Sequence, residues 1–492
     1  MKSVAFHNLG CKVNGYEMDF MQQTLQEKGY KIVPFDKKAD IYIINTCTVT
    51  NIADRKSRQM LHRAKKLNPD AVVVAVGCYV QAGREEALKD MSIDLAIGNN
   101  KKKDLVEILE EYLEVQAERT KESRIQEKSA VKHKEAADSK KQGSEEAVDM
   151  EGIDESALEE EAIGKKTLQG KTIIDIGHTD EYESMQLKTT AEHTRAFIKV
   201  QDGCNQFCTY CIIPYARGRI RSRDMEEVLT EVKGLAAAGY REVVLTGIHL
   251  SSYGMTGGTD FSKSKLLDLV RAVNGVEGID RIRLGSLEPR IITEEFAKGL
   301  SECEKICPHF HLSLQSGSAE VLKRMNRKYT PEEYYEKVCI LRKYFDDPAV
   351  TTDVIVGFPK ETEEEFAETE RFLEKVGFYE MHIFKYSKRQ GTPAAVMQGQ
   401  VPEEVKGLRS NRLLELEQRM SAEYRKVHLH KEVTVLFEEE KVFGGRTYQV
   451  GHTPEYIKAA FETEENVSGR IITGVLTEAV MSDILLFREQ IH

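Results

Sequence analysis

The sequence predicts an α/β protein in which two parallel α/β units precede a small antiparallel β unit. In the first part of the chain, short apolar runs such as residues 41–44 and 72–76 alternate with longer amphipathic segments, as in parallel layer folds. The same alternation returns from about residue 190 to residue 390. Beyond about residue 425, apolar runs separated by glycines predict short antiparallel strands.

The composition is that of a soluble globular protein. Hydrophobic residues make up 40% of the chain and charged residues 31%, and no apolar run approaches the roughly 18 residues that a membrane helix needs. The first residues lead directly into a strand pattern, without the basic stretch and apolar core of a signal peptide. We therefore expect a soluble protein of the cytoplasm with no membrane contact.

The formal net charge of −11 argues against nucleic acid as a partner, because phosphate binding favours a basic surface. The distribution of charge weakens that argument. Nine acidic residues and no basic one lie between Gly143 and Ile163, so this single stretch supplies most of the excess. The folded parts of the chain are closer to neutral, and RNA binding stays open.

The order of these patterns divides the chain into four segments, of which two lie before residue 190. Residues 1–118 form the first parallel α/β layer domain, with strands expected at 4–9, 41–46 and 72–77. Residues 119–189 have few aromatic residues and no clear helix or strand period over most of their length. We expect this segment to be a charged insertion or linker that is mostly disordered.

Residues 190–424 form the second parallel unit, in which six strand candidates predict a partial (β/α) barrel. The candidates are residues 196–200, 242–245, 281–284, 310–314, 350–356 and 382–386. A charged helix pattern follows from about residue 403 to residue 429. The last segment, residues 425–492, is the predicted small antiparallel β-barrel.

Three cysteines in the second unit carry the first chemical signal. Cys204, Cys208 and Cys211 form a C-x3-C-x2-C run, which can hold three irons of a 4Fe-4S cluster while the fourth iron stays open. An open iron can bind the amino and carboxylate groups of S-adenosylmethionine and place its sulfonium beside a one-electron donor. A zinc site is the alternative, but it needs four ligands and usually two cysteine pairs, and no second pair lies nearby. The run therefore favours an iron–sulfur cluster and radical chemistry.

A second set of cysteines follows three of the predicted strands. Cys11, Cys47 and Cys78 each come directly after the strands expected in residues 1–118. Because the carboxyl ends of parallel strands share one edge of a sheet, where ligands bind, we expect these thiols to converge on one site. Three separately buried cysteines are the alternative interpretation. The remaining three cysteines of the chain lack this arrangement, and we interpret them as packing residues.

Together these features resemble the radical S-adenosylmethionine methylthiotransferases, and the resemblance covers nearly the whole chain outside the 119–189 insertion. The matching segments are residues 9–14 (LGCKVN), 45–47 (NTC), 77–78 (GC), 201–204 (QDGC), 214–218 (PYARG), 245–247 (LTG), 311–317 (HLSLQSG) and 353–359 (DVIVGFP). The Gly-Cys-Lys-Val-Asn form at residues 10–14 is most similar to the MtaB-type branch, which acts on threonylcarbamoyladenosine in tRNA. The isopentenyladenosine branch usually has Gly-Cys-Gln-Met-Asn there, and the ribosomal-protein branch has Gly-Cys-Pro-Lys-Asn.

The resemblance implies two 4Fe-4S clusters and S-adenosylmethionine as cofactors. One S-adenosylmethionine methylates sulfur at the cluster on Cys11, Cys47 and Cys78, and another is cleaved at the Cys204 cluster to a radical that takes hydrogen from carbon 2 of the adenine. No catalytic residue beyond the cluster ligands is required, and an external donor such as a flavodoxin or ferredoxin supplies electrons. By analogy, five residues at strand ends line the S-adenosylmethionine pocket, although ordinary turn or capping roles explain them equally well. They are Thr246, Gly247, Ser286, Gln315 and Asp353.

The implied partner is tRNA, bound through its anticodon stem-loop. Two basic stretches beside the predicted cluster loops are candidates for phosphate contacts, although a charge run is usually a solvated face. The first stretch has arginines at spacing two, which an extended backbone places on one face. Its members are Arg217, Arg219, Arg221 and Arg223. The second stretch follows Cys47 on a predicted helix and includes Arg55 and Arg58.

Residues 425–492 resemble the TRAM domain, a small RNA-binding barrel. Within this segment Tyr456 is a candidate for stacking on a base, and packing in the core is the equal alternative. Two other functions also stay open from the sequence. In the first, the same chemistry acts on isopentenyladenosine in tRNA or on a ribosomal-protein aspartate. In the second, the protein is not an enzyme but an iron–sulfur protein that binds RNA or carries electrons.

Overall fold

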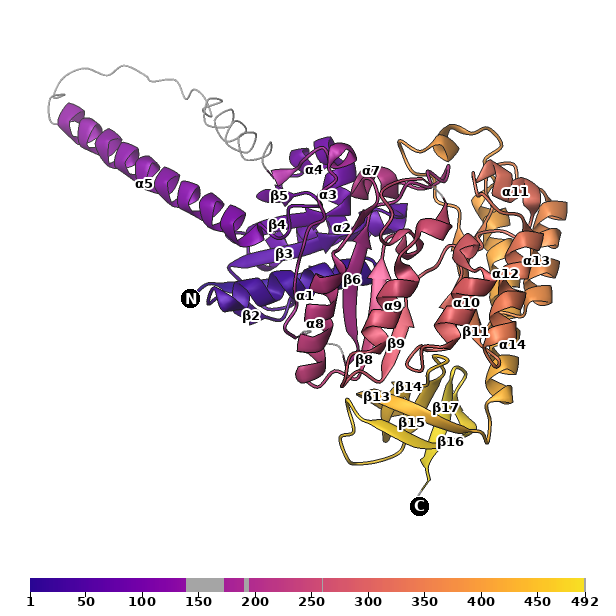
Figure 1. The fold of residues 1–492 in the computed structure, drawn as a ribbon. Coiled ribbons are helices and arrows are strands. Elements are labelled where there is room, and N and C mark those ends of the chain that lie inside the picture. Colours follow the sequence, from indigo (N-terminus) through magenta and orange to yellow (C-terminus); the bar gives the residue numbers. More distant parts are fainter. Residues whose placement is uncertain (139–171, 190–193, 259, 491–492) are drawn as a thin grey trace.

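The computed structural model describes residues 1–138, 172–189, 194–258 and 260–490. These residues form an N-terminal α/β domain, a central α/β core and a C-terminal β-barrel, as Figure 1 shows. Among them, no helix is long and apolar enough to cross a membrane. The N-terminal domain and the core were expected as parallel units, and both are, except that one two-residue strand at the edge of the core pairs antiparallel.

The N-terminal domain is a five-stranded parallel sheet in the order β2-β1-β3-β4-β5. Its central strands are almost wholly apolar because helices cover both faces, which leaves no side of the strands in water. The strands are β1 (Ser3–Asn8), β2 (Lys31–Val33), β3 (Ile41–Thr46), β4 (Val72–Gly77) and β5 (Leu95–Ile97). The helices are α1 (Lys12–Glu27), α2 (Asn51–Leu67), α3 (Cys78–Ala82), α4 (Arg84–Lys89) and α5 (Leu105–Asp138).

The expected linker at residues 119–189 differs from the structure at both of its ends. Helix α5 continues through residue 119 to Asp138 and extends away from the domain in Figure 1. Residues 172–189 lie between the N-terminal domain and the core, where Ile173, Met185 and Leu187 are buried. These apolar side chains pack against residues that are distant in the sequence, so the periodicity of the local sequence could not predict their burial. Residues 139–171, the centre of the expected linker, lie outside the described residues.

The core is a barrel that is open between two sheets, ordered β7-β6-β8-β9 and β10-β11-β12. Two isolated parallel bridges, Ile282–Ile306 and Leu287–Leu312, connect the two sheets. The strands are β6 (Ala196–Asp202), β7 (Arg221–Ser222), β8 (Glu242–Gly247), β9 (Arg281–Leu284), β10 (His309–His311), β11 (Ala349–Val356) and β12 (Glu380–Lys385). All six expected strands are present, and this confirms the partial barrel.

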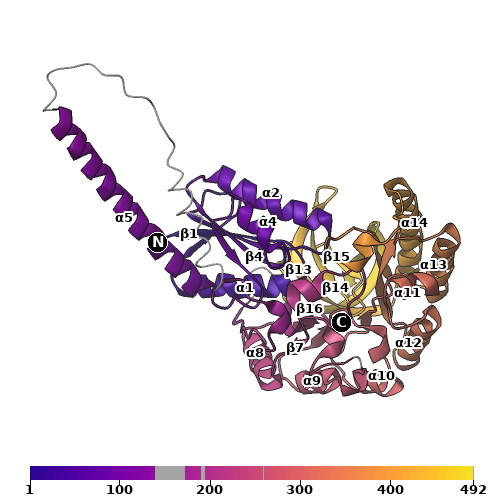
Figure 2. The same ribbon diagram turned by 90° about the horizontal axis from the view of Figure 1, so that it is seen from above.

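Helices cover the outside of this barrel, as the view from above in Figure 2 shows. The α-helices are α7 (Ile213–Arg217), α8 (Met225–Ala237), α9 (Leu266–Asn274), α10 (Glu294–Ser301), α11 (Ala319–Arg324), α12 (Pro331–Tyr344), α13 (Glu363–Val376) and α14 (Glu403–Val427). Short 3-10 turns are η1 (Ile176–His178), η2 (Leu250–Ser252), η3 (Phe261–Lys263), η4 (Pro289–Ile291) and η5 (Pro393–Val396).

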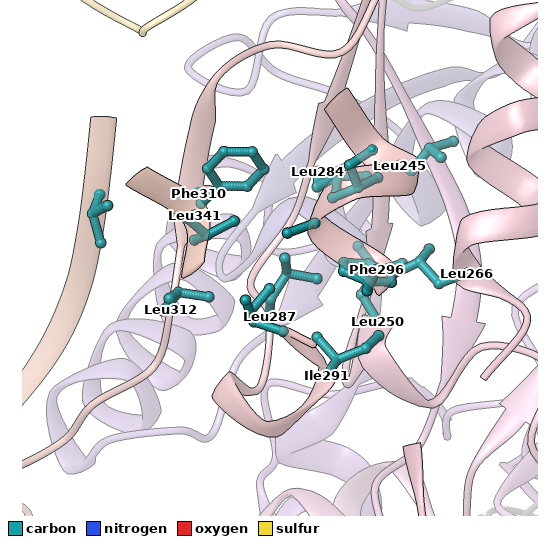
Figure 3. Packing of buried hydrophobic residues seen from close by; sticks show 14 of the residues in the cluster. Leu245, Leu250, Leu266, Leu284, Leu287, Ile291, Phe296, Phe310, Leu312 and Leu341 are labelled. Atoms are coloured by element: carbon teal, nitrogen blue, oxygen red, sulfur yellow. The ribbon is translucent and has the colours of Figure 1, made fainter. Parts of the chain in front are cut away.

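Buried hydrophobic side chains from strands and helices pack against one another in the core (Figure 3). Leu245 and Leu284 come from neighbouring strands, and Phe296 and Leu341 come from the helices packed on them. Each such side chain is buried, and full burial of a leucine or phenylalanine contributes roughly 1.5–3 kcal/mol. This packing fixes the strand ends from which the site residues project.

The C-terminal unit is a closed barrel in the order β13-β14-β15-β17-β16. Its strand pairs are antiparallel except for β15 and β17, which run parallel. The strands are β13 (Glu432–Phe443), β14 (Arg446–His452), β15 (Lys458–Phe461), β16 (Ile471–Met481) and β17 (Ile484–Glu489). Figure 1 shows this barrel at the end of the core opposite α7. Arg281 and Arg283 of β9 donate to its backbone carbonyls at 2.8–2.9 Å, so the barrel is docked by buried guanidinium groups.

Candidate functional site

The three cysteines of the C-x3-C-x2-C run lie in the loop between β6 and α7, where they line one pocket. The pocket has a volume of about 140 Å³, and Cys204, Cys208 and Cys211 all contribute to its wall. Burial raises the pKa of the Cys204 thiol to about 12, and the neighbouring Cys208 raises it as well. Thiolates gathered in such a buried place need a compensating positive charge, which a metal centre provides. The thiols therefore fit an iron–sulfur cluster.

The turn into this loop requires a glycine at residue 203. Gly203 has a φ of +73°, and a Cβ atom there would lie 1.8 Å from the backbone oxygen of Arg219. The adjacent Cys204 N–H donates to the Gly218 oxygen at 3.0 Å, so the two ends of the cluster loop are tied together. The left-handed backbone at Gly203 and the close approach of the segment that contains Arg219 explain why only glycine fits there.

The remaining wall of the pocket carries groups of both charges. Glu288 and Arg327 both line it, and Arg327 also donates to the Cys208 sulfur at 3.4 Å and to the Ser313 oxygen at 3.0 Å. Burial and the nearby Arg327 and Arg290 lower the pKa of His249 to about 3, so its ring is neutral. A carboxylate and a guanidinium facing one small pocket suit a zwitterion, with ammonium and carboxylate ends. The amino-acid half of S-adenosylmethionine has this chemistry.

Two of the five residues expected in the S-adenosylmethionine pocket line it, namely Ser286 and Gln315. The lining does not include Thr246, which is buried at the end of β8, or its neighbour Gly247. Asp353 lies inside β11, where its carboxylate is 3.3 Å from His311 Nε2. The position of these residues at strand ends correctly predicted which end of the barrel carries the pocket. It did not distinguish side chains that line the pocket from side chains that contact other residues.

Sequence reasoning missed Glu288, Arg327 and His249. Glu288 and His249 follow β9 and β8 within a few residues, so the strand-end argument that led to Ser286 could have been extended to them. Arg327 follows α11, whose sequence gives no sign that its end turns back toward the cysteine loop. Its approach to Cys208 depends on a contact across 119 residues, which no local pattern reports.

The N-terminal cysteines follow three neighbouring strands, as expected, and lie together. Cys11 precedes α1, Cys47 follows β3, and Cys78 is the first residue of α3. Burial, together with the charges of Cys78 and Cys11, raises the pKa of Cys47 to about 11. A Cβ atom at Gly10 would lie 3.3 Å from the Cys47 Cβ atom, and Arg217 contacts both the Cys78 sulfur and Asn14, whose Oδ1 lies 3.6 Å from the Cys11 sulfur. The three thiols therefore share one site. They fit a second cluster held by three protein thiolates.

A glycine again precedes a cysteine at a tight place. Gly77 has a φ of +98°, and a Cβ atom there would lie 2.8 Å from Asn45 Oδ1 and 3.1 Å from the Thr46 oxygen. The glycine lets β4 end abruptly, so that α3 begins at the next residue, Cys78. Helix α3 contacts α7, which begins just after the cysteine loop of the core. The two cysteine sets therefore lie on the two sides of a single domain junction.

Most of the arginines expected on one RNA-binding face are buried, and this prediction is wrong for three of the four. Arg217, Arg221 and Arg223 are at most 3% exposed. Arg217 ends helix α7 instead of lying on an extended segment, and Arg223 pairs with Glu231. Spacing of two places side chains on one face only in a strand, and β7 has just two residues. Buried guanidinium groups that pair with carboxylates cannot contact phosphate.

Arg219 is the exception in that stretch. Its side chain is exposed, and its guanidinium carbon lies 4.6 Å from the centre of the Phe207 ring. Tyr215 is 48% exposed and meets Phe207 edge to face at 6.4 Å. All three line a pocket of about 430 Å³ beside the domain junction. In the second basic stretch, Arg55 is exposed, and Arg58 is half-buried with its guanidinium 5.9 Å from the Tyr79 ring.

Tyr456 does not offer a free ring to a base. Its ring is stacked on His452 at 4.4 Å and on His309 at 4.9 Å, and the guanidinium of Arg283 lies 4.7 Å from its centre. The tyrosine therefore packs between the C-terminal barrel and the core. This supports the packing alternative, because the ring's partners come from both units.

Two family models match the chain. Residues 198–373 match the Radical SAM superfamily, and residues 3–98 match the family described as uncharacterized protein family UPF0004. The first range contains the C-x3-C-x2-C loop, and the second contains the three N-terminal cysteines.

Curated relatives match nearly the full chain. It is 39% identical over 480 residues to the threonylcarbamoyladenosine tRNA methylthiotransferase MtaB of Bacillus subtilis (strain 168), covering 97% of this chain and 94% of the relative. The MtaB of Aquifex aeolicus (strain VF5) is 40% identical over 437 residues, covering 89% and 93%. A tRNA-2-methylthio-N(6)-dimethylallyladenosine synthase of Acetivibrio thermocellus is 36% identical over 463 residues, covering 91% and 84%.

Among solved structures, the radical S-adenosylmethionine methyltransferase TsrM from Kitasatospora setae, with cobalamin and a [4Fe-4S] cluster bound, matches with a TM-score of 0.50. The match covers 80% of this chain and 77% of TsrM at 14% identity. At that identity the likeness concerns the fold, and it agrees with the arrangement of an α/β domain on a partial barrel.

Proposed function

The chain belongs to the radical S-adenosylmethionine methylthiotransferases, and we propose that its substrate is tRNA carrying threonylcarbamoyladenosine next to the anticodon. The enzyme inserts a methylthio group at carbon 2 of that base. The observation that carries this conclusion is the identity of 39–40% to two threonylcarbamoyladenosine tRNA methylthiotransferases over 89–97% of the chain. The Gly-Cys-Lys-Val-Asn form at residues 10–14 supports the same branch.

Cys204, Cys208 and Cys211 hold one 4Fe-4S cluster in this proposal, and Cys11, Cys47 and Cys78 hold a second. When bound, the cofactors supply the radical that removes hydrogen from carbon 2, and the sulfur and methyl group that replace it. Each set of three thiols has one buried cysteine, Cys78 or Cys208, whose sulfur accepts a hydrogen bond from an arginine, and this common arrangement supports two clusters of the same kind. The protein residues bind, orient and shield, and none of them is required as a nucleophile.

Glu288 and Arg327 bind the two charged ends of the S-adenosylmethionine amino-acid group. Arg327 is fixed for this task because Tyr329 accepts its Nε–H at 2.8 Å and the Ser313 oxygen accepts a second N–H at 3.0 Å. Glu288 pairs with Arg290, whose guanidinium also reaches Gln206 at 3.2 Å. A pocket of fixed donors and acceptors orients the sulfonium group without reorganisation, which is where enzymes gain most in such reactions.

The domain junction holds the two cysteine sets in a constant relation. Asn99 of the N-terminal domain donates to the Ala216 oxygen of α7 at 2.7 Å, and its amide also lies 3.5 Å from the Cys78 sulfur. On the far side, Arg389 donates to Thr48 at 2.6 Å, next to Cys47. Substrate carbon 2 must meet both cofactor sites, so a junction fixed by hydrogen bonds on two sides supports the proposal.

We place the tRNA contact beside this junction. The exposed Arg219, with Phe207 and Tyr215, offers a guanidinium and two aromatic rings of the kind on which unpaired RNA bases stack. Arg55 and Arg58 on α2 are the proposed phosphate contacts. The C-terminal barrel, residues 425–492, is proposed as a further RNA-binding unit through its outer surface, with Tyr456 serving the domain contact instead of a base.

The proposal also includes an electron donor and a place in the cell. An external one-electron donor such as a flavodoxin or ferredoxin reduces the cluster on Cys204, Cys208 and Cys211. The reaction takes place in the cytoplasm, where mature tRNA is found. Reconstitution with either donor in place of a chemical reductant tests the first point, with deoxyadenosine formation as the readout.

Nucleoside analysis of tRNA tests the substrate. A strain lacking the gene is expected to accumulate threonylcarbamoyladenosine without its methylthio group, and the wild-type gene is expected to restore it. A Cys11→Ala variant, matched by Cys339→Ala as a control outside both sites, is expected to fail. Unchanged methylthio-threonylcarbamoyladenosine in the deletion strain would refute the proposed substrate.

The alternatives predict other outcomes of the same analysis. Loss of the methylthio group from isopentenyladenosine would favour the activity named for the Acetivibrio thermocellus relative, and loss from a ribosomal-protein aspartate would favour the third branch. A protein that only binds RNA or carries electrons would form no deoxyadenosine from S-adenosylmethionine after reduction. The identity of 39–40% to the two MtaB relatives, against 36% to the Acetivibrio thermocellus relative, and the Gly-Cys-Lys-Val-Asn form at residues 10–14 favour the threonylcarbamoyladenosine substrate.

A further inference from the structure

Arg217 is a fully buried arginine that joins the N-terminal cysteine site to the core. It ends α7, and its side chain is 0% exposed. Its Nε–H donates to the Cys78 sulfur at 3.3 Å, and one terminal nitrogen donates to Asn14 at 2.6 Å. Asn14 Oδ1 in turn lies 3.6 Å from the sulfur of Cys11. One guanidinium of the core thus contacts one cysteine of the N-terminal site directly and a second through Asn14.

The other half of the same guanidinium enters a buried network of charges at the domain junction. Arg217 pairs with Glu17 of α1 at 2.5 Å and with Asp202 of β6 at 3.3 Å. Lys199 pairs with both of these carboxylates and Lys102 pairs with Glu17, and all of these side chains are at most 2% exposed. Removing any member leaves a buried charge without its partner, which is costly in a low-dielectric place.

The charges of this network do not cancel without the cysteine site. Three buried carboxylates, Glu17, Asp202 and Glu183, interact with four buried cations, so one positive charge is in excess. The cations are Lys102, Lys199, Arg217 and Arg221. Three thiolates outweigh the positive charge of an oxidised 4Fe-4S core, so an occupied cysteine site is anionic. An arginine stays protonated in proteins and presents several N–H groups in one plane, which lets it serve a carboxylate and a sulfur together. The surplus positive charge is placed where the thiolates are.

We propose that Arg217 is a positioning residue of the N-terminal cluster, which raises the reduction potential of that cluster by donating a hydrogen bond to the Cys78 thiolate. This inference rests on the proposed function, because it requires a cluster on Cys11, Cys47 and Cys78. Hydrogen bonds to ligand sulfurs stabilise the reduced, more negative state of a cluster. The same guanidinium binds the core to the N-terminal domain, so the electronic state of the cluster and its placement against the radical site depend on one side chain.

A redox titration of the N-terminal cluster alone tests this inference. The background is the full chain with Cys204, Cys208 and Cys211 changed to alanine, which leaves one cluster to observe by electron paramagnetic resonance. In that background, Arg217→Gln is expected to shift the midpoint potential to a more negative value. Lys199→Gln is the matched control, because it removes one positive charge from the same network but contacts no sulfur. Its shift is expected to be clearly smaller.

The outcomes separate the inference from the proposed function. Equal shifts in Arg217→Gln and Lys199→Gln, or no shift in either, would overturn the role of the hydrogen bond while leaving the cluster in place. Absence of any cluster signal in the unsubstituted background would instead refute the second cluster itself. Where Arg217→Gln does not retain its cluster, Arg217→Lys keeps the positive charge but loses the planar donor, and its potential is expected to lie below that of the background.

Discussion

Replacing Glu17 with glutamine is expected to weaken the junction between the two cluster-bearing domains more than any surface change. Glu17 is 1% exposed and accepts from Lys102, Lys199 and Arg217. Removing one partner of a buried charge network costs about 3–5 kcal/mol, because the other charges stay buried. At about 2–4 °C per kcal/mol for a unit of 150–250 residues, the melting temperature is expected to fall by about 6–20 °C.

Glu27→Gln is the matched control on the same helix. Glu27 pairs with Lys188 at 2.7 Å, but the two side chains are 48% and 75% exposed. Such a surface pair contributes about 0–1 kcal/mol, so its loss is expected to leave the melting temperature nearly unchanged. Melting followed anaerobically by fluorescence, with limited proteolysis at the junction, checks both variants. Equal melting temperatures for Glu17→Gln and Glu27→Gln would refute the reasoning.

Three further predictions concern acid, the cysteine loop and the RNA surface. Burial alone would raise the pKa of Glu17, but the charges of Arg217, Lys102 and Lys199 hold it well below its usual value. The stability that Glu17 contributes is therefore full above an unfolded pKa of about 4.3 and is lost as the pH falls below that value. The melting temperatures of wild type and Glu17→Gln are expected to converge in acid. Gly203→Ala is expected to prevent cluster binding in the core loop, seen as loss of about half the iron and of all deoxyadenosine formation, because its Cβ would lie 1.8 Å from a backbone oxygen; normal iron content would contradict this. Tyr215→Ala is expected to weaken binding of an anticodon stem-loop RNA by about 5–150-fold in fluorescence anisotropy, because one stacked base contributes about 1–3 kcal/mol. Deoxyadenosine formation in the absence of RNA is expected to stay unchanged, and an unchanged RNA affinity would exclude this surface from the RNA contact.

The sequence predicted those parts of the fold and site that depend on local pattern. Strand ends placed Cys11, Cys47 and Cys78 at one edge of a sheet, because each cysteine closely follows one of three consecutive strands of that sheet, β1, β3 and β4. The C-x3-C-x2-C spacing likewise predicted that Cys204, Cys208 and Cys211 share one site, because all three lie in one short segment. In both cases the information lies within a few residues of the cysteine.

The failures concern partners that are far away in the chain. Arg217 had the same local appearance as Arg219, but its carboxylate partner Glu17 lies 200 residues earlier. Arg223 likewise depends on packing of α8 to bring Glu231 to it. Tyr456 is covered by histidines of two units, one of them 147 residues earlier in the chain. A charge or an aromatic ring looks accessible in a sequence unless the fold that covers it is already known.

The most direct test of the central claim is one reaction with purified components. The reconstituted, reduced full chain is incubated with S-adenosylmethionine and with tRNA that carries either threonylcarbamoyladenosine or isopentenyladenosine, and the nucleosides are analysed by mass spectrometry. The expected result is a methylthio group on threonylcarbamoyladenosine only, with deoxyadenosine formed alongside it. Deoxyadenosine without a methylthio product, or a product on isopentenyladenosine alone, would contradict the claim.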